Sequence, residues 1–209
     1  MLAAMSNQPQ TRRATCATCL RPQPACICAW IAPLDTAVSV LILQHPLEVS
    51  SAKGSARLLH LSLPGSVLLT GEAFDPDVLS GLLNEGGRTP VLLYPAAVDN
   101  LITPPALDPA ILAAPSALRL VVLDGTWRKS RKMLHLNPQL QGLPRLALQG
   151  MPASHYRIRK AHAPDQLSTL EAAAYALMQL DGGAARFAPL IDAFDGFVAQ
   201  QAARIPHLA

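Results

Sequence analysis

Long hydrophobic runs are absent from this sequence. Half of its 209 residues are hydrophobic, yet no uninterrupted apolar run approaches the roughly 20 residues with which a helix crosses a bilayer. The first ten residues lack the basic start and the long apolar stretch of a secretory signal. These absences argue against membrane insertion and secretion, so we expect a cytoplasmic location and no membrane partner.

Acidic residues are absent between Gly125 and Pro164. The whole chain has 17 basic and 14 acidic residues. This window has a net charge of +8, and the rest of the chain, with 9 basic and 14 acidic residues, has −5. Its basic residues are Arg128, Lys129, Arg131, Lys132, Arg145, Arg157, Arg159 and Lys160. Such segregation indicates a polyanionic partner, with nucleic acid first, although a solvated basic helix face is the alternative.

Cysteine is absent outside one short segment, which holds all four: Cys16, Cys19, Cys26 and Cys28. Thiolates at this spacing suit tetrahedral Zn²⁺. Two disulfides or four ordinary thiols are the alternatives, and the missing secretory signal disfavours disulfides. A site closed by four sulfurs would be structural, because catalytic zinc keeps an open position. We therefore predict a zinc knuckle within residues 1–32, followed by one domain over residues 33–209.

Apolar and periodic segments alternate along that domain. Strands are expected at Val38–Gln44, Ser66–Thr70, Pro90–Tyr94, Leu118–Leu123 and Arg145–Leu148. Helices are expected at Ser51–Leu61, Asp75–Asn84, Arg128–Leu136, Thr169–Leu180 and Pro189–Ala203. The Pro-rich stretch Thr103–Pro115 reads as a loop or a short helix. This order predicts an α/β fold, with a mostly parallel sheet covered by helices on both faces.

Asp124, Gly125, Thr126 and Trp127 follow the strand expected at Leu118–Leu123. Open α/β sheets bind their ligands at the carboxyl ends of strands, so this is a candidate site. Turn chemistry is the alternative: Gly permits the bend, Thr caps the next helix and Trp packs.

Polar loops also follow or precede other elements. His45 and Glu48 come after the first expected strand, before Lys53 and Arg57. They could meet a ligand, an RNA phosphate or each other, although a histidine beside proline is more often a hydrogen-bonded loop residue. Ser168 and Glu171 form a capping-box pattern, and a helix N-terminus there would suit a carboxylate or phosphate.

Together these motifs resemble the DTW-domain proteins, which are tRNA-uridine aminocarboxypropyltransferases. The resemblance extends from about Arg13 to the end of the chain. Besides the four cysteines, it rests on His45-Pro46 with Glu48, Asp124 with Thr126-Trp127 and the following Arg128–Met133, Tyr156-Arg157 with Arg159-Lys160, and Ser168-Thr169 with Glu171-Ala172. Each motif alone is weak, but five in register are specific.

The resemblance implies a reaction and a fold. The family takes S-adenosylmethionine as co-substrate and donates its 3-amino-3-carboxypropyl group to N3 of a uridine in tRNA, in bacterial members typically in the variable loop. The implied fold is similar to the SPOUT methyltransferases, whose C-terminal segment forms a trefoil knot. A SPOUT-type RNA methyltransferase and a non-catalytic, zinc-stabilised RNA-binding module are the alternative functions.

Roles are assigned on this basis as predictions. The catalytic candidates are Asp124, Thr126 and Trp127, with Asp124 either removing the uridine proton or holding a substrate. Donor binding is assigned to Tyr94, Pro95 and Trp127 on the adenine and methyl side, and to Asp124, Ser168 and Thr169. RNA binding is assigned to His45, Lys53, Arg57, Arg128, Lys129, Arg131, Lys132, Arg157, Arg159 and Lys160. No sequence feature identifies an oligomer interface.

Overall fold

A computed structural model of the chain describes residues 14–96, 103–155 and 167–204. Its centre is a five-stranded sheet in the order β2-β1-β4-β3-β5, and every strand pair is parallel. The strands are β1 (Ser39–Gln44), β2 (Val67–Thr70), β3 (Thr89–Leu93), β4 (Leu118–Asp124) and β5 (Arg145–Leu146). All five expected strands are present, which confirms the α/β prediction.

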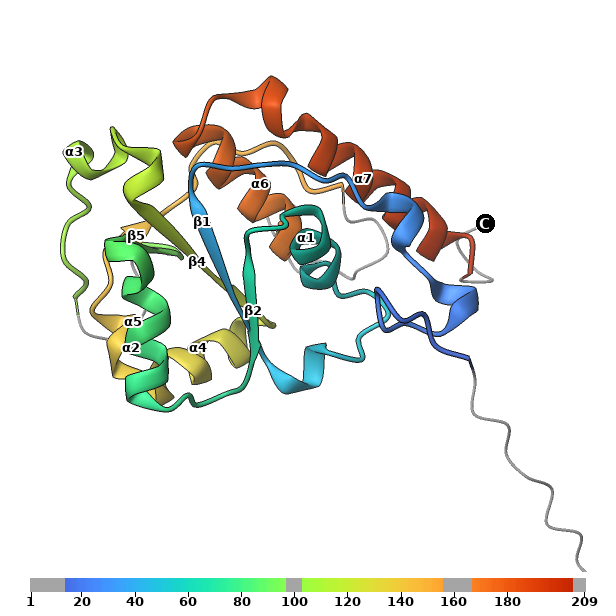
Figure 1. Cartoon of the computed structure of the whole chain (residues 1–209), viewed down its shortest axis with the longest axis horizontal. Helices are drawn as coiled ribbons and strands as arrows, with labels where there is room; N and C mark the ends of the chain where they lie inside the picture. The colour runs from blue at the N-terminus through green and yellow to red at the C-terminus, as the bar shows by residue number, and fades with distance from the viewer. Residues whose placement is uncertain (1–13, 97–102, 156–166, 205–209) are drawn as a thin grey trace, which may run out of the picture.

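Helices cover both faces of this sheet (Figure 1). The α-helices are α1 (Ala56–Ser62), α2 (Pro76–Asn84), α3 (Pro109–Leu112), α4 (Trp127–Leu136), α5 (Pro138–Gln141), α6 (Thr169–Leu180) and α7 (Ala184–Ala202). Short 3-10 helices are η1 (Gln23–Ala25), η2 (Cys28–Trp30), η3 (Pro46–Glu48), η4 (Glu85–Gly87) and η5 (Pro115–Ala117). Within the described ranges, no helix is long and apolar enough to span a membrane.

Alternating side chains divide the core into two layers. Val40 and Ile42 of β1 pack with α1, α6 and α7, while Leu41 and Leu43 pack with α2, α4 and α5. Successive strand residues point to opposite faces, so a strand covered on both sides is largely apolar. This explains the nearly continuous apolar runs of β1 and β4, in which Arg119 of β4 is the exception and pairs with Glu85.

Two helix starts and one helix differ from the sequence expectations. The first helix begins at Ala56 instead of Ser51, because residues 51–54 are held in turns by the hydrogen bond from Gly54 N to Ser51 O. The last begins at Ala184, five residues before Pro189. Proline removes one backbone donor from a helix interior, but burial of Phe187 and Leu190 holds this helix on both sides of it. Helix α5 was not expected.

The N-terminal cysteine segment packs against α7. The indole Nε1 of Trp30 donates to Gln200 Oε1 at 2.7 Å, and Gln200 Nε2 donates to Cys26 O at 2.9 Å. Gly196 makes room for the Trp30 ring, since a Cβ at this glycine would lie 2.1 Å from two ring carbons. The absence of a side chain at Gly196 therefore lets this segment pack closely against α7.

Parallel pairing brings the carboxyl ends of the strands to one edge of the sheet. From β1 the chain moves to β2 on one side, whereas β4 and β3 lie on the other side. Such a reversal of direction is where open α/β sheets form ligand clefts. The loops that follow β3, β4 and β5 meet there with the N-terminus of α6.

Candidate functional site

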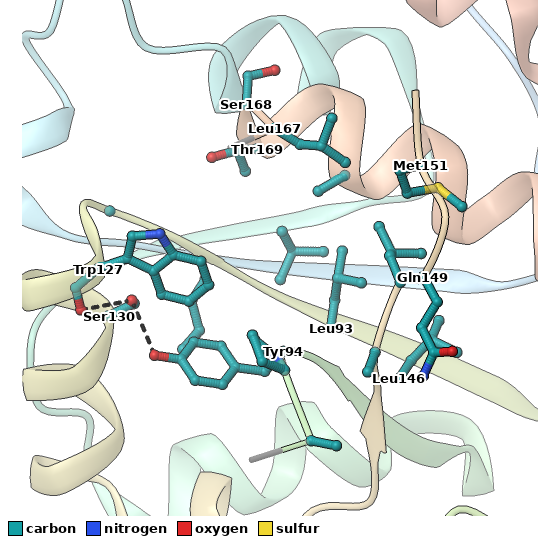
Figure 2. A pocket seen from close by; sticks show the side chains of 18 of the residues that line it. Leu93, Tyr94, Trp127, Ser130, Leu146, Gln149, Met151, Leu167, Ser168 and Thr169 are labelled. Carbon is teal, nitrogen blue, oxygen red and sulfur yellow. Dashed lines mark hydrogen bonds between the residues drawn. The ribbon is translucent and has the colours of Figure 1, made fainter. Parts of the chain in front are cut away.

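A cavity of about 680 Å³ lies at this edge of the sheet (Figure 2). This volume is within the usual range for small-molecule sites. Its floor is apolar, with Leu93, Val122 and Leu146 at the ends of three strands. The more polar or aromatic lining residues are Tyr94, Trp127, Ser130, Gln149, Ser168 and Thr169.

Two aromatic rings form one wall of the cavity. Tyr94 and Trp127 meet edge to face, with ring centroids 5.6 Å apart and planes at 73°. The Tyr94 hydroxyl lies 3.4 Å from Ser130 Oγ, which donates to Trp127 O at 3.1 Å. Burial raises the pKa of Tyr94, so this phenol stays protonated near neutral pH. The wall is thus held from β3 and α4 together.

Thr126 begins α4. Its Oγ1 accepts a hydrogen bond from Lys129 N at 3.4 Å and caps the helix. The backbone at Gly125 lies close to the Lys129 side chain, since a Cβ at position 125 would be 3.1 Å from the Cβ of Lys129. These contacts account for the turn chemistry of the motif, and they leave the predicted catalytic role of Thr126 as a prediction.

Asp124 is buried beside the cavity. Its Oδ2 accepts from Gln44 Nε2 at 2.8 Å, and its Oδ1 accepts from the Thr169 hydroxyl at 2.7 Å. The described residues that line the cavity include Gly125 and Thr169 but not Asp124. The Thr169 hydroxyl therefore links Asp124 to the cavity. The sequence did not predict the bond from Gln44. Its only indication was a polar residue at the end of an apolar strand.

Ser168 and Thr169 stand at the N-terminus of α6, and the expected capping box is present. Ser168 Oγ accepts from Glu171 N at 3.2 Å, and Leu170 N donates to Ser55 Oγ at 3.1 Å. Two of the first N–H groups are therefore already used. Among the described residues, none accepts the hydroxyl proton of Ser168, so this proton can be donated to a ligand.

Glu171 joins two walls of the cavity. Its buried carboxylate accepts from Ser168 N at 2.7 Å, from His155 N at 2.7 Å and from Ser154 Oγ at 2.8 Å. Ser154 and His155 end the segment that supplies the lining residues from Leu146 to Met151. The capping-box pattern predicted the bond to Ser168 but gave no sign of the other two.

The basic residues of α4 fall into two groups. Lys129 Nζ pairs with Glu48 Oε1 at 2.7 Å, and Lys132 Nζ pairs with Glu72 Oε2 at 2.8 Å. Arg128 and Arg131 are exposed. Lys132 lowers the pKa of Glu72. At least two of the four positive charges on this helix are thus already balanced by carboxylates, which the distribution of charge along the sequence could not reveal.

Other residues predicted to bind RNA lie in different surroundings. His45 is buried; its Nε2 meets Glu72 Oε1, and its Nδ1 accepts from Leu47 N at 3.1 Å. His45 is thus a hydrogen-bonded loop residue, and its predicted RNA contact stays a prediction. Lys53 is exposed, whereas Arg57 donates to Thr18 O at 3.1 Å. Tyr156, Arg157, Arg159 and Lys160 lie outside the described residues.

The four cysteines form a cluster that could hold a metal ion. All four Sγ atoms lie within 4.8 Å of one another. Cys16 and Cys28 are 3.6 Å apart, and Cys19 and Cys26 are 3.8 Å apart. A tetrahedral metal with bonds near 2.3 Å places its sulfurs about 3.8 Å apart, so the geometry fits. Backbone hydrogen bonds from Cys19 and Thr18 lower the pKa of Cys16 to about 6, which favours the thiolate.

Known proteins match this chain over most of its length. It is 31% identical over 182 residues to tRNA-uridine aminocarboxypropyltransferase 2 of Macaca fascicularis, and 31% identical over 177 residues to that of Mus musculus. These matches cover 83% and 81% of this chain, but 59% and 57% of the relatives. The Drosophila melanogaster relative of the same name is 33% identical over 186 residues, covering 86% of this chain and 72% of its own. No solved structure matches the chain.

The DTW domain matches residues 13–202. This range contains the cysteine cluster, the whole sheet, the cavity and the N-terminus of α6. The resemblance in the sequence is thereby confirmed: the chain belongs to the DTW-domain family.

Proposed function

We propose that this protein transfers the 3-amino-3-carboxypropyl group of S-adenosylmethionine to N3 of a uridine in tRNA, with the variable loop as the proposed location. The names of three relatives support aminocarboxypropyl transfer to tRNA uridine. The observation that carries the proposal is the cavity, which joins an aromatic wall to a hydroxyl-bearing helix N-terminus at the edge of a parallel sheet.

The donor would lie across this cavity. Tyr94, Pro95 and Trp127 are proposed for its adenine and methyl side, on the wall formed by the two rings. Its carboxylate is proposed at Ser168, whose hydroxyl can donate, beside the positive end of the α6 dipole. Anchoring both ends selects which carbon of the sulfonium faces the acceptor, and such orientation is worth about 7–11 kcal/mol in well-oriented reactions.

The transfer forms one carbon–nitrogen bond and breaks one carbon–sulfur bond. The uridine N3 lone pair forms a bond to the terminal carbon of the aminocarboxypropyl arm. The bond from that carbon to sulfur breaks, and its electron pair stays on sulfur, so methylthioadenosine leaves as a neutral thioether. The N3 proton must also be removed, so the protein has to supply a group that accepts it.

Asp124 is the proposed acceptor of that proton, acting through Thr169. The threonine hydroxyl lies on the cavity and donates to Asp124 at 2.7 Å, so it can take the N3 proton while passing its own to the carboxylate. Asp124 could instead only orient Thr169. Asp124→Asn and the wild type separate these roles by their pH–rate profiles: a retained profile with most of the activity would eliminate proton transfer.

Binding of tRNA is proposed to rest on the basic window. Exposed Arg128 and Arg131 extend from the cavity along α4, and their charges would attract the phosphate backbone. Lys53, Arg157, Arg159 and Lys160 remain predicted RNA contacts. We also propose that the protein acts in the cytoplasm, where its four cysteines, which form no disulfide, would stay reduced.

The proposal also includes a bound metal and a fold relationship. Zinc is the proposed metal of the four cysteines, where it would fix the knuckle against α7 without taking part in catalysis. A SPOUT-like relationship and a C-terminal trefoil knot are also proposed, from the resemblance of the sequence to the DTW-domain family. An experimental structure that traces residues 149–170 would test the knot.

Mass spectrometry of tRNA tests the function. Unmodified tRNA is incubated with the protein and S-adenosylmethionine, digested to nucleosides and compared with a no-enzyme control. The proposal predicts aminocarboxypropyluridine in the digest. An added methyl group would indicate a methyltransferase, and an unchanged tRNA that still binds would indicate an RNA-binding module; either result would refute the proposal.

A further inference from the structure

Trp127 is unusual among the apolar side chains at the surface. The exposed large hydrophobic side chains of the described residues are Leu20, Leu47, Val49, Val78, Trp127 and Leu136. Of these, Trp127 also lines the cavity. Half of its surface is exposed (50%), although it is the largest apolar side chain of the set. A side chain that served packing alone would bury this area.

The indole is partly covered and partly open. Tyr94 meets it with the ring planes at 73°, and Ser130 Oγ donates to the backbone carbonyl of Trp127, so two residues that line the cavity contact Trp127. Figure 2 shows the indole reaching from α4 over Tyr94 and below Thr169. Because half of the Trp127 surface stays exposed beside this contact, ring surface remains available to another π system.

Basic residues follow Trp127 along the helix. Trp127 is the first residue of α4, and exposed Arg128 and Arg131 follow it on the same helix. An aromatic face beside exposed arginines is the arrangement that binds single-stranded nucleic acid, where bases stack on aromatic rings while cations track the backbone. A buried donor pocket alone does not require either feature.

We propose that Trp127 is the platform on which the acceptor nucleobase stacks, so that the indole separates two subsites. Its inner edge borders the donor, and its exposed face receives the uracil from solvent. The inference rests on the proposed function for the identity of the base. It adds the place where the base binds and the residue that recognises it by stacking.

A single-tryptophan protein provides the direct test. The chain has two tryptophans, and Trp30→Phe leaves Trp127 as the reporter. Oligouridylate is titrated against an abasic oligonucleotide of equal length, which has the same charge and no bases. The platform predicts that oligouridylate changes the fluorescence of Trp127 and that the abasic strand does not. Equal responses to both strands would overturn the inference.

Substitution of Trp127 tests the energetic contribution. Stacking on one aromatic ring corresponds to about 5- to 160-fold in affinity, so we expect Trp127→Leu to weaken oligouridylate binding by a factor in this range. Trp127→Phe keeps a π face and should stay within about threefold of the wild type. Leu136→Ala removes another exposed apolar side chain from α4 outside the cavity, and it should bind normally.

Double substitution of protein and RNA completes the test. The uridine that wild-type protein modifies is replaced by an abasic nucleotide in the tRNA. Its loss should weaken binding to the wild type and have little further effect on Trp127→Leu, because both changes remove the same contact. Additive losses would overturn the platform while the transferase stands. Failure of the wild type to modify any uridine would refute the proposed function, whereas the oligouridylate titration still decides whether Trp127 stacks bases.

Discussion

The hydroxyl of Thr169 donates to Oδ1 of Asp124 across 2.7 Å, and this bond joins the end of β4 to the start of α6. Gln44 donates to the other carboxylate oxygen at 2.8 Å. The carboxylate is thus fixed from two sides. Only Thr169 of these three residues lines the cavity, so its hydroxyl links Asp124 to the cavity.

Thr169→Val tests that relationship, since valine keeps the shape and removes the hydroxyl. We expect kcat to fall by about 100-fold or more, the range of general base catalysis. Thr169→Ser keeps the hydroxyl and should retain kcat within about tenfold. Thermal unfolding of both variants controls for the buried acceptor left unpaired, which costs about 1–3 kcal/mol. Equal kcat values for the two variants would remove the hydroxyl from the mechanism.

Single substitutions on α4 should separate an exposed basic residue from one that pairs with a carboxylate. Arg128→Gln should weaken tRNA binding and reduce the slope of log K against log salt by about 0.7–0.9 for one lost phosphate contact. Lys129→Gln should change that slope less, because Glu48 already pairs with this lysine. The measurement is tRNA affinity over a salt series. A larger change for Lys129→Gln would reverse the assignment.

Gly196→Ala should loosen the cysteine knuckle. The added Cβ would lie 2.1 Å from the Trp30 ring, and such overpacking costs about 1–3 kcal/mol of unfolding free energy. Gly81→Ala is the matched control, since a Cβ at this glycine in α2 meets nothing within 4 Å. It should be neutral or stabilise the fold by up to about 1 kcal/mol. Urea unfolding, with zinc content measured in parallel, compares them; equal stability of both variants would contradict the packing argument.

Acid should destabilise the protein through His60. Burial lowers the pKa of His60 below its ordinary value of 6.5, and neighbouring Arg57 lowers it further. The unfolded chain therefore binds this proton at a higher pH than the folded chain. Stability is retained above pH 6.5 and is lost as pH falls from there through the lowered pKa. His60→Gln should lose less stability between pH ~7.5 and ~5.5 in urea unfolding; an identical loss would assign the effect to other groups.

Sequence patterns predicted the strands and the edge where the cavity lies, for a physical reason. Apart from Arg119, whose buried guanidinium pairs with Glu85, Leu118–Leu123 is apolar because β4 is buried on both faces, and polar residues follow where this run ends. The start of α7 could not be predicted in this way. Pro189 signals a helix start locally, but tertiary burial of Phe187 extends the helix before it.

The contacts within the site were hidden from the sequence for another reason. Spacing indicated that Ser168 and Glu171 form a capping box, because that interaction is local. The bonds of Glu171 to Ser154 and His155, and the ion pair of Lys129 with Glu48, join residues that only the folded chain brings together. Charge counted along the chain therefore overstated the free positive charge on α4.

Transfer of two isotopic labels is the most direct test of the central claim. S-adenosylmethionine is supplied with one label in the methyl group and another in the carboxyl carbon of the aminocarboxypropyl arm, together with unmodified tRNA. The account predicts that the carboxyl label enters tRNA while the methyl label leaves with methylthioadenosine. Methyl label in the tRNA, with the carboxyl label left in solution, would contradict it.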